Sequence, residues 1–337
     1  MPKVSIIIPN YNNSEYLAGC INSVRAQTFQ DIEIIVVDDC SKDDSQKVIK
    51  KLVAIDRRIV FHKMAKNSGV GMARNAGIAI ARGEFVMFLD SDDLLCPTAV
   101  DGLMMVQNGT SADMVVGNYT RVAEDFHIPN DAAYMPPTFA FEGFEELNDF
   151  VQKIDNLNLV TVWGKLIRRR IVKDLRFVPI HPHEDVEFML RLYGRTRVGA
   201  ITPNLAVYYR LSATSVMADK ARDVSKNIAV VLESIAATAL DYDDNYMRFV
   251  KRYAYVFLRL WLGSMVRKIK KASGNRPEQR KLRVQMKFMS KCVRRILKTG
   301  VFHGINVSAK HMLALRLFGW GFILSSANML MYKDGKI

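Results

Sequence analysis

The sequence predicts an α/β protein with a mostly parallel sheet flanked by helices, followed by a basic α-helical extension. Strand-like and helix-like segments alternate over the first 120 residues. The strand-like runs are apolar on both faces, as in parallel sheets that helices cover on both sides. Polar residues gather where these runs end, which is where α/β sheets bind ligands. We therefore expect an α/β domain over residues 1–219, divided into 1–120 and 121–219, and a helical region over 220–337.

The elements of the first part follow from hydrophobic periodicity. Apolar, β-branched runs predict strands, and the amphipathic stretches between them predict helices. The predicted strands cover residues 4–8, 32–37, 59–62, 84–89 and 114–117. The predicted helices cover residues 14–27, 43–55, 68–82 and 97–107. Strands separated by helices favour parallel pairing, because parallel neighbours need a crossover connection.

The second part has a less regular pattern. Residues 124–145 lose periodicity and predict a long surface excursion, a kind of loop that is often functional. An organised stretch follows at 159–169, and a helix is expected from 182 to about 193. Residues 198–201 and 206–210 have the character of two closing strands.

The region 220–337 is helical in pattern and strongly basic. Helices are predicted over 225–240, 246–271 and 279–299. Residues 248–316 hold nineteen Lys or Arg and one acid, a charge of about +18 in a chain of net charge +14. Such a segment suits an anionic membrane surface, nucleic acid or a phosphorylated substrate, and charge alone does not separate these. A solvated basic face over an apolar packing stripe is the structural alternative.

A largely apolar stretch of about twenty residues, 312–331, lies near the end of the chain and is long enough to span a bilayer. It contains Arg316, Asn328 and several small residues, which favours an interfacial or packed helix over a membrane span. Together with the basic helices before it, this stretch predicts docking on an anionic membrane surface.

The composition indicates a globular protein with reduced thiols. Hydrophobic residues make up 49% and charged residues 24% of the 337, as in soluble domains. The four cysteines have neither metal-binding spacing nor the density of a disulfide framework. The first apolar run ends at Pro9, too early for the core of a signal peptide. We expect a cytoplasmic protein attached peripherally to the inner face of the cytoplasmic membrane.

Three carboxylates, Asp90, Asp92 and Asp93, follow the predicted strand 84–89 directly. Like charges this close must be neutralised by protonation, by partners or by a metal ion, and oxygen ligands suit Mg²⁺ or Mn²⁺. The alternative is a solvated turn that caps the helix expected near Pro97.

A glycine-containing segment, 67–77, opens another predicted helix. A dinucleotide fingerprint is rejected, because Arg74 stands where the third glycine would be required. Gly69 and Gly71 instead allow close backbone approach at a helix start, where amide groups and Arg74 face an anion. An ordinary glycine cap with a surface arginine is the alternative.

Taken in order, four segments, 5–12, 35–43, 67–77 and 88–93, resemble those of family 2 glycosyltransferases, which have the Rossmann-like GT-A fold. The resemblance extends over about residues 3–215. It implies an inverting glycosyltransferase of the bacterial polysaccharide type. In that family the residues matching Pro9, Tyr11 and Asp39 hold the nucleotide base, with the carboxylate accepting the uracil imide proton.

The resemblance also assigns the diphosphate and metal contacts. Arg74 would lie near the phosphates. Asp90, Ser91 and Asp92 match the family's Asp-X-Asp element, which implies Mn²⁺ or Mg²⁺ held by Asp92 and Asp90. Asp93 is either a supporting acid or a helix cap.

An inverting transfer needs a base for the acceptor hydroxyl. Asp185, in a Glu-Asp pair at a predicted helix start, matches the family's base, and Glu184 would orient the acceptor. The alternative is an acid that only stabilises the helix N-terminus, worth about 0.3–1 kcal/mol. His181 and His183 have ligand-like spacing only if they lie on a strand, and an incidental pair is the favoured interpretation.

Three further residues are candidate acceptor or phosphate contacts. Trp163 could stack on a sugar or pack in the core, Lys165 could approach a phosphate, and Arg210 resembles a phosphate contact of the family's closing segment.

The expected reaction moves a sugar from a UDP-sugar to a saccharide hydroxyl, with a polyprenyl-linked oligosaccharide as the expected acceptor. A sugar-nucleotide nucleotidyltransferase is the nearest enzymatic alternative, but it would need a glycine-rich N-terminal loop that this chain lacks. A non-catalytic nucleic-acid-binding protein that uses the basic tail is the alternative from another class. No nucleic-acid partner is expected.

Overall fold

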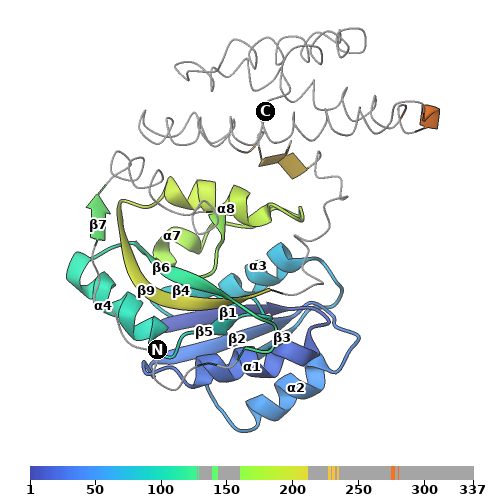
Figure 1. Cartoon of the computed structure of the whole chain (residues 1–337), viewed down its shortest axis with the longest axis horizontal. Helices are drawn as coiled ribbons and strands as arrows, with labels where there is room; N and C mark the ends of the chain where they lie inside the picture. Colours follow the sequence, from blue (N-terminus) through green and yellow to red (C-terminus); the bar gives the residue numbers. More distant parts are fainter. Residues whose placement is uncertain are drawn as a thin grey trace. The chain divides into compact units, whose positions relative to one another are not determined.

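The computed structural model describes residues 1–126, 128, 139–142 and 160–211, together with residues 227, 228, 230, 231, 234, 275–277 and 280. The chain divides into two compact units, Met1–Arg222 and Asp223–Ile337. The first unit holds the fold described below, which Figure 1 colours from blue to yellow.

Most of the predicted basic region lies outside the described residues. This applies to the helices expected at 246–271 and 279–299, apart from Arg280, and to the apolar stretch 312–331. Within the helix expected at 225–240, the described residues are helical. No helix in the described parts of the chain has the length and apolar character needed to cross a membrane.

The described strands form one mixed sheet. Their order is β3-β2-β1-β4-β8-β6-β9-β5, with β7 paired to β9. Strands β1 to β4 pair only in parallel with one another, as the sequence predicts. Antiparallel pairs join β8 to β4 and β6, and join β9 to β5 and β7. The strands are β1 (Val4–Asn10), β2 (Ile32–Asp38), β3 (Ile59–Lys63), β4 (Phe85–Phe88), β5 (Leu94–Leu95), β6 (Met114–Val122), β7 (Phe139–Glu142), β8 (Lys165–Arg168) and β9 (Val198–Arg210).

Helices cover both faces of the sheet (Figure 1). Side chains alternate along β1, so Ile6 and Ile8 face one side, where they share a core with Leu17 of α1 and Leu103 of α4. Ile7 faces the other side and meets α3, where a Cβ at Gly77 would lie 2.4 Å from Ile7 Cγ2. The helices are α1 (Ser14–Arg25), α2 (Ser45–Val53), α3 (Val70–Ile80), α4 (Ala99–Thr110), α7 (Arg169–Val172) and α8 (Glu184–Tyr193).

Three strands of the sheet differ from the prediction. Residues 198–201 and 206–210 are not separate strands but belong to the single strand β9. Strand β6 pairs with β9 in parallel along nearly the whole length of β9. The predicted strand 114–117 extends to Val122 for the same reason. Residues 139–142, inside the expected excursion 124–145, form β7 on β9. Much of the rest of that excursion lies outside the described residues.

Candidate active site

The carboxyl ends of β1, β2 and β4 meet at one edge of the sheet, because these strands are parallel neighbours. Hydrogen bonds join these strand ends to one another and the loops that follow them. Asn10 Nδ2 donates to Asp38 Oδ1 at 3.1 Å, and Asn13 Nδ2 donates to Ser91 Oγ at 2.9 Å. The polar strand ends found in the sequence therefore form one site.

The predicted base-binding residues lie at the ends of β1 and β2. Asp39 is buried, and its two oxygens accept the main-chain N–H groups of Ser68 at 2.8 Å and Gly69 at 2.7 Å. A carboxylate has about four lone-pair sites, so these bonds leave room for a further donor. Pro9 is buried in β1, and Tyr11 is 43% exposed.

The acids after β4 form a charged loop that is held in place. Arg74 Nη2 donates to Asp90 Oδ1 at 2.7 Å. Burial and the charge of Asp90 raise the pKa of Asp92 to about 6. Asp93 accepts the main-chain N–H of Arg210 at 2.9 Å, and burial and the charge of Asp92 raise its pKa well above the usual range.

Helix capping by this acid loop is excluded. Strand β5 separates Asp93 from α4, and the N-cap of α4 is Thr98. Of the two roles weighed for Asp93, the helix cap is therefore wrong. Instead, Asp93 anchors the end of β9 to the acid loop.

The donor set at this loop fits a hard divalent cation. Asp90 and Asp92 offer carboxylate oxygens, and the charge of Asp90 opposes ionisation of Asp92. Mg²⁺ is often held by one or two carboxylates plus substrate phosphates. Among the described residues, no group of three or more His, Cys, Asp or Glu forms a metal site of its own.

Arg74 joins the acid loop to α8. Arg74 is 4% exposed, and its guanidinium bridges Asp90 to Glu184 Oε1, the second contact at 3.0 Å. Burial opposes its charge, but Asp90 and Glu184 keep the pKa of Arg74 above its usual range. The surface-arginine alternative is thus wrong.

The Glu-Asp pair opens α8, as predicted. Burial and the charge of Glu184 raise the pKa of Asp185 to about 6. Burial also favours a higher pKa for Glu184. The hydrogen bond with His181 (3.2 Å) and the charge of Arg74 outweigh it, so the pKa of Glu184 lies below its ordinary value. Neighbouring carboxyl groups with pKa values pushed apart are typical of acid–base sites. Asp185 Oδ1 also accepts the N–H of Val186 at 2.8 Å.

Two candidate substrate contacts are buried beneath the site. Trp163 is 4% exposed and stacks on Tyr209, with ring centroids 5.6 Å apart. Lys165 is fully buried, and its ammonium donates to Thr161 O at 2.6 Å. Burial lowers the pKa of Lys165 to about 7. Both side chains are thus packed inside the protein, as the core alternative weighed for Trp163 expects.

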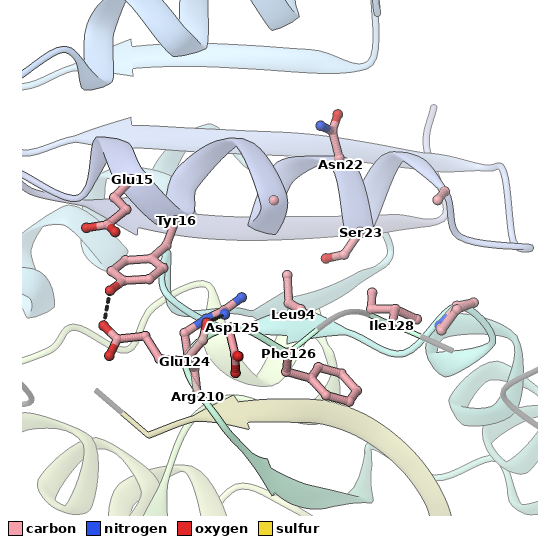
Figure 2. A pocket seen from close by; sticks show the side chains of 13 residues that line it. Glu15, Tyr16, Asn22, Ser23, Leu94, Glu124, Asp125, Phe126, Ile128 and Arg210 are labelled. Carbon is pink, nitrogen blue, oxygen red and sulfur yellow. Dashed lines mark hydrogen bonds between the residues drawn. The ribbon is translucent and has the colours of Figure 1, made fainter. Parts of the chain in front are cut away.

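The Arg210 side chain also makes hydrogen bonds and a ring contact within the protein. Its Nε donates to Asp92 O at 2.9 Å, its Nη1 donates to Glu124 O, and its guanidinium lies over the Tyr16 ring. Tyr16, Glu124 and Arg210 border a cavity of about 680 Å³ between α1 and residues 124–126 and 128 (Figure 2). Arg210 is the one predicted site residue that lines it.

The structure adds a residue to which sequence reasoning gave no role. The Asn75 side chain makes two hydrogen bonds with the main chain of Phe177, 102 positions away. Its place next to Arg74 in the glycine-containing segment was the signal available in the sequence.

Comparison with known proteins identifies the family of this chain. The model of the family Glycosyl transferase family 2 matches residues 5–176. Glycosyltransferase GlyA of Streptococcus pneumoniae is 36% identical over 180 residues, which are 52% of this chain, and the match covers 26% of that relative's length. The UDP-Glc:alpha-D-GlcNAc-diphosphoundecaprenol beta-1,3-glucosyltransferase WfaP of Escherichia coli is 31% identical over 71% of this chain and 89% of its own length.

A solved structure has the same fold. S. aureus TarS 1-349, in complex with UDP-GlcNAc, superposes with a TM-score of 0.73 at 20% identity, covering 97% of this chain and 90% of that one. The predicted α/β fold of the GT-A class is confirmed, with parallel pairing throughout β1 to β4 and a mixed arrangement beyond. The chain belongs to glycosyl transferase family 2 and is a glycosyltransferase.

Proposed function

We propose that this protein is an inverting glycosyltransferase that moves a sugar from a UDP-sugar to a hydroxyl group of a saccharide acceptor. The Asp90–Arg74–Glu184 bridge carries the proposal, because one buried guanidinium joins the donor-side acids to the start of the helix that bears Asp185. An inverting transfer needs those two parts at one site.

The donor's base would lie between the Pro9–Tyr11 turn and Asp39. The free lone pairs of Asp39 would accept the uracil N3–H, and the exposed Tyr11 ring offers a stacking face. Cytosine lacks this proton, so a buried acceptor disfavours it. The UDP-GlcNAc complex of TarS and the UDP-Glc donor named for WfaP support a uracil nucleotide.

Asp90 and Asp92, with Ser91 between them, would hold Mn²⁺ or Mg²⁺ together with the diphosphate. Bound there, the cation would stabilise the charge that develops on the departing nucleoside diphosphate. Arg74 holds Asp90 in place, and Arg210 holds the loop at Asp92.

Asp185 would accept the proton of the acceptor hydroxyl. As that oxygen forms its bond to the anomeric carbon, the bond from this carbon to UDP breaks, and attack from the opposite side inverts the configuration. A base with a pKa of about 6 is deprotonated at neutral pH and still basic enough to accept a proton. Glu184 stays ionised and supports Arg74.

The proposed acceptor is a lipid-linked oligosaccharide in cell-surface polysaccharide synthesis, as the diphosphoundecaprenol substrate named for WfaP suggests. Residues 1–120 would bind the donor, residues 121–219 the acceptor and base, and the basic region 220–337 an anionic membrane surface. Flotation of the full chain should succeed with anionic vesicles and fail with neutral ones. Equal flotation, or capture of the chain by nucleic acid in competition with anionic vesicles, would refute the membrane role.

Nucleotide binding tests the donor site. With Mn²⁺ present, titration calorimetry should give tighter binding of UDP than of CDP. Asp39→Asn should weaken UDP binding by roughly 10–100-fold, because it removes a charged hydrogen-bond acceptor. Equal affinities for UDP and CDP would contradict this assignment of Asp39.

A further inference from the structure

One face of α3 contacts the segment that leads into α8. Gly71, Arg74 and Asn75 are spaced three and four residues apart, so they lie on the same side of the helix. Their partners are Phe177 and Glu184, more than 100 positions later in the chain. The donor half of the domain thus holds the segment that carries the Glu-Asp pair.

Asn75 holds Phe177 by both of its main-chain polar groups. Asn75 Nδ2 donates to Phe177 O at 2.9 Å, and Phe177 N donates to Asn75 Oδ1 at 2.8 Å. A planar amide that makes two such bonds fixes the orientation of a residue as well as its position, because both bonds must be satisfied together.

Gly71 allows α3 to approach this segment closely. A Cβ at position 71 would lie 3.0 Å from Phe177 Cβ and 3.4 Å from Glu184 Cγ. The approach is therefore tighter than an alanine at this position would permit without displacing the segment by a few tenths of an ångström. Gly109 in α4 is a contrast, since a Cβ there would have nothing within 4 Å.

The Phe177 ring contacts residues from both halves of the site. Its ring stacks on Phe188 of α8, with centroids 3.8 Å apart, and meets the edge of Phe88 at 5.7 Å. Phe88 ends β4, two residues before Asp90. The Arg74 guanidinium lies over the same Phe177 ring at 5.4 Å.

We infer that Asn75 is a positioning residue for the reaction: its amide fixes Phe177, and through Phe177 and Phe188 it fixes where the first turn of α8 places Asp185 relative to the acids after β4. The inference rests on the proposed function for the role of Asp185. The contact itself does not depend on that function. Gly71 contributes to the same positioning, because it sets how closely the Phe177 segment lies against α3.

The test compares Asn75→Ala with Gln27→Ala in the full chain. Gln27 is a matched control, since its buried amide also holds main-chain groups of another segment, at Cys96 O and Val100 N rather than at Phe177. We expect Asn75→Ala to lower kcat for sugar transfer by about 10–100-fold with the donor KM unchanged, because small misplacement of a reacting group has effects of that size. Gln27→Ala should lower Tm and leave kcat of the folded protein within about twofold.

Hydrogen–deuterium exchange supplies a reading that needs no substrate. In Asn75→Ala, amide exchange should accelerate in peptides covering 176–193 and stay unchanged in β1 and β2. Gly71→Ala should show the same local effect, more weakly, and Gly109→Ala should show none. If Asn75→Ala shows no local acceleration, or a kcat no lower than that of Gln27→Ala, the positioning role is refuted. If wild-type protein transfers no sugar, the proposed function fails, and the exchange pattern still decides whether Asn75 fixes the segment.

Discussion

Replacing Asp185 with asparagine should abolish sugar transfer and make the fold more stable. Burial and the charge of Glu184 raise the pKa of Asp185 from an ordinary 3.8 to about 6 in the folded protein. A carboxyl group with a raised folded pKa binds its proton more tightly when folded, so stability is lost as pH rises through about 6. The amide is uncharged and keeps an oxygen for the Val186 N–H, which the carboxylate accepts at 2.8 Å.

The size of the effect follows from the two pKa values. Each pH unit between them is worth about 1.4 kcal/mol, so the ionised group destabilises the fold by at most about 3 kcal/mol at pH 8. Asp185 is only partly buried, and solvent screening reduces this to about 1–2 kcal/mol. For a domain of this size the gain corresponds to a rise in Tm of about 2–8 °C. At pH 5 about half of this gain in stability should remain, since the carboxyl group is then mostly protonated in the folded protein and mostly ionised in the unfolded chain.

Thermal melts of the full chain at pH 5 and pH 8 measure this gain. Asp101→Asn is the control, because Asp101 is an exposed acid in the first turn of α4, where its removal should destabilise the fold by about 0.3–1 kcal/mol. If Asp185→Asn lowers Tm at pH 8 as Asp101→Asn does, Asp185 is an acid that only stabilises a helix terminus. An unchanged gain between the two pH values would refute the raised pKa.

Three further outcomes are expected. The kcat for sugar transfer should rise with pH through about 6 and then level off, because Asp185 acts as a base only when deprotonated; a flat profile between pH 5 and 8 would contradict this. Gly77→Ala should destabilise the fold by about 1–3 kcal/mol in denaturant titration, since its Cβ would lie 2.4 Å from Ile7 Cγ2, and a neutral effect would show that α3 can move away. Stability should rise by about 2 kcal/mol from pH 7 to pH 9, because the folded pKa of Lys165 is about 7, below its ordinary 10.5; this rise should be absent in Lys165→Met, and its persistence would assign it elsewhere.

The strands of the first part were predictable because their signal is local. Val4–Asn10 and Ile32–Asp38 are fully buried, and a parallel strand covered on both faces is a nearly continuous apolar run. The meeting of Asp39 and Asp90 at one site followed as well, since parallel strands end at the same edge.

Strands β5 and β9 were harder to predict because their pairing is non-local. Strand β5 has two residues and exists only through its pairing with β9. Strand β9 continues through Thr202–Asn204, polar and proline-containing residues that have the sequence character of a turn. Short or interrupted strands of this kind depend on their neighbours, which periodicity does not reveal.

The contacts within the site show the same limit. Arg74 was expected to face an anionic ligand, but its guanidinium bridges two carboxylates, one of them 110 positions away. Arg210 was expected at a phosphate, and in the structure its guanidinium donates to Asp92 O, 118 positions away. The sequence indicated which residues are chemically suited to the site, and the pairing among them is determined by tertiary structure.

The central claim is that Asp92 and Asp185 divide one reaction between donor and acceptor. Its most direct test is release of nucleoside diphosphate from a panel of UDP-, GDP- and CDP-sugars in Mn²⁺ buffer, measured for the wild-type chain, Asp92→Asn and Asp185→Asn. We predict release from a UDP-sugar by the wild type, loss of release in both variants, and UDP binding that is weakened in Asp92→Asn but retained in Asp185→Asn. Release by either variant at the wild-type rate, or a donor that is not a UDP-sugar, would contradict the account.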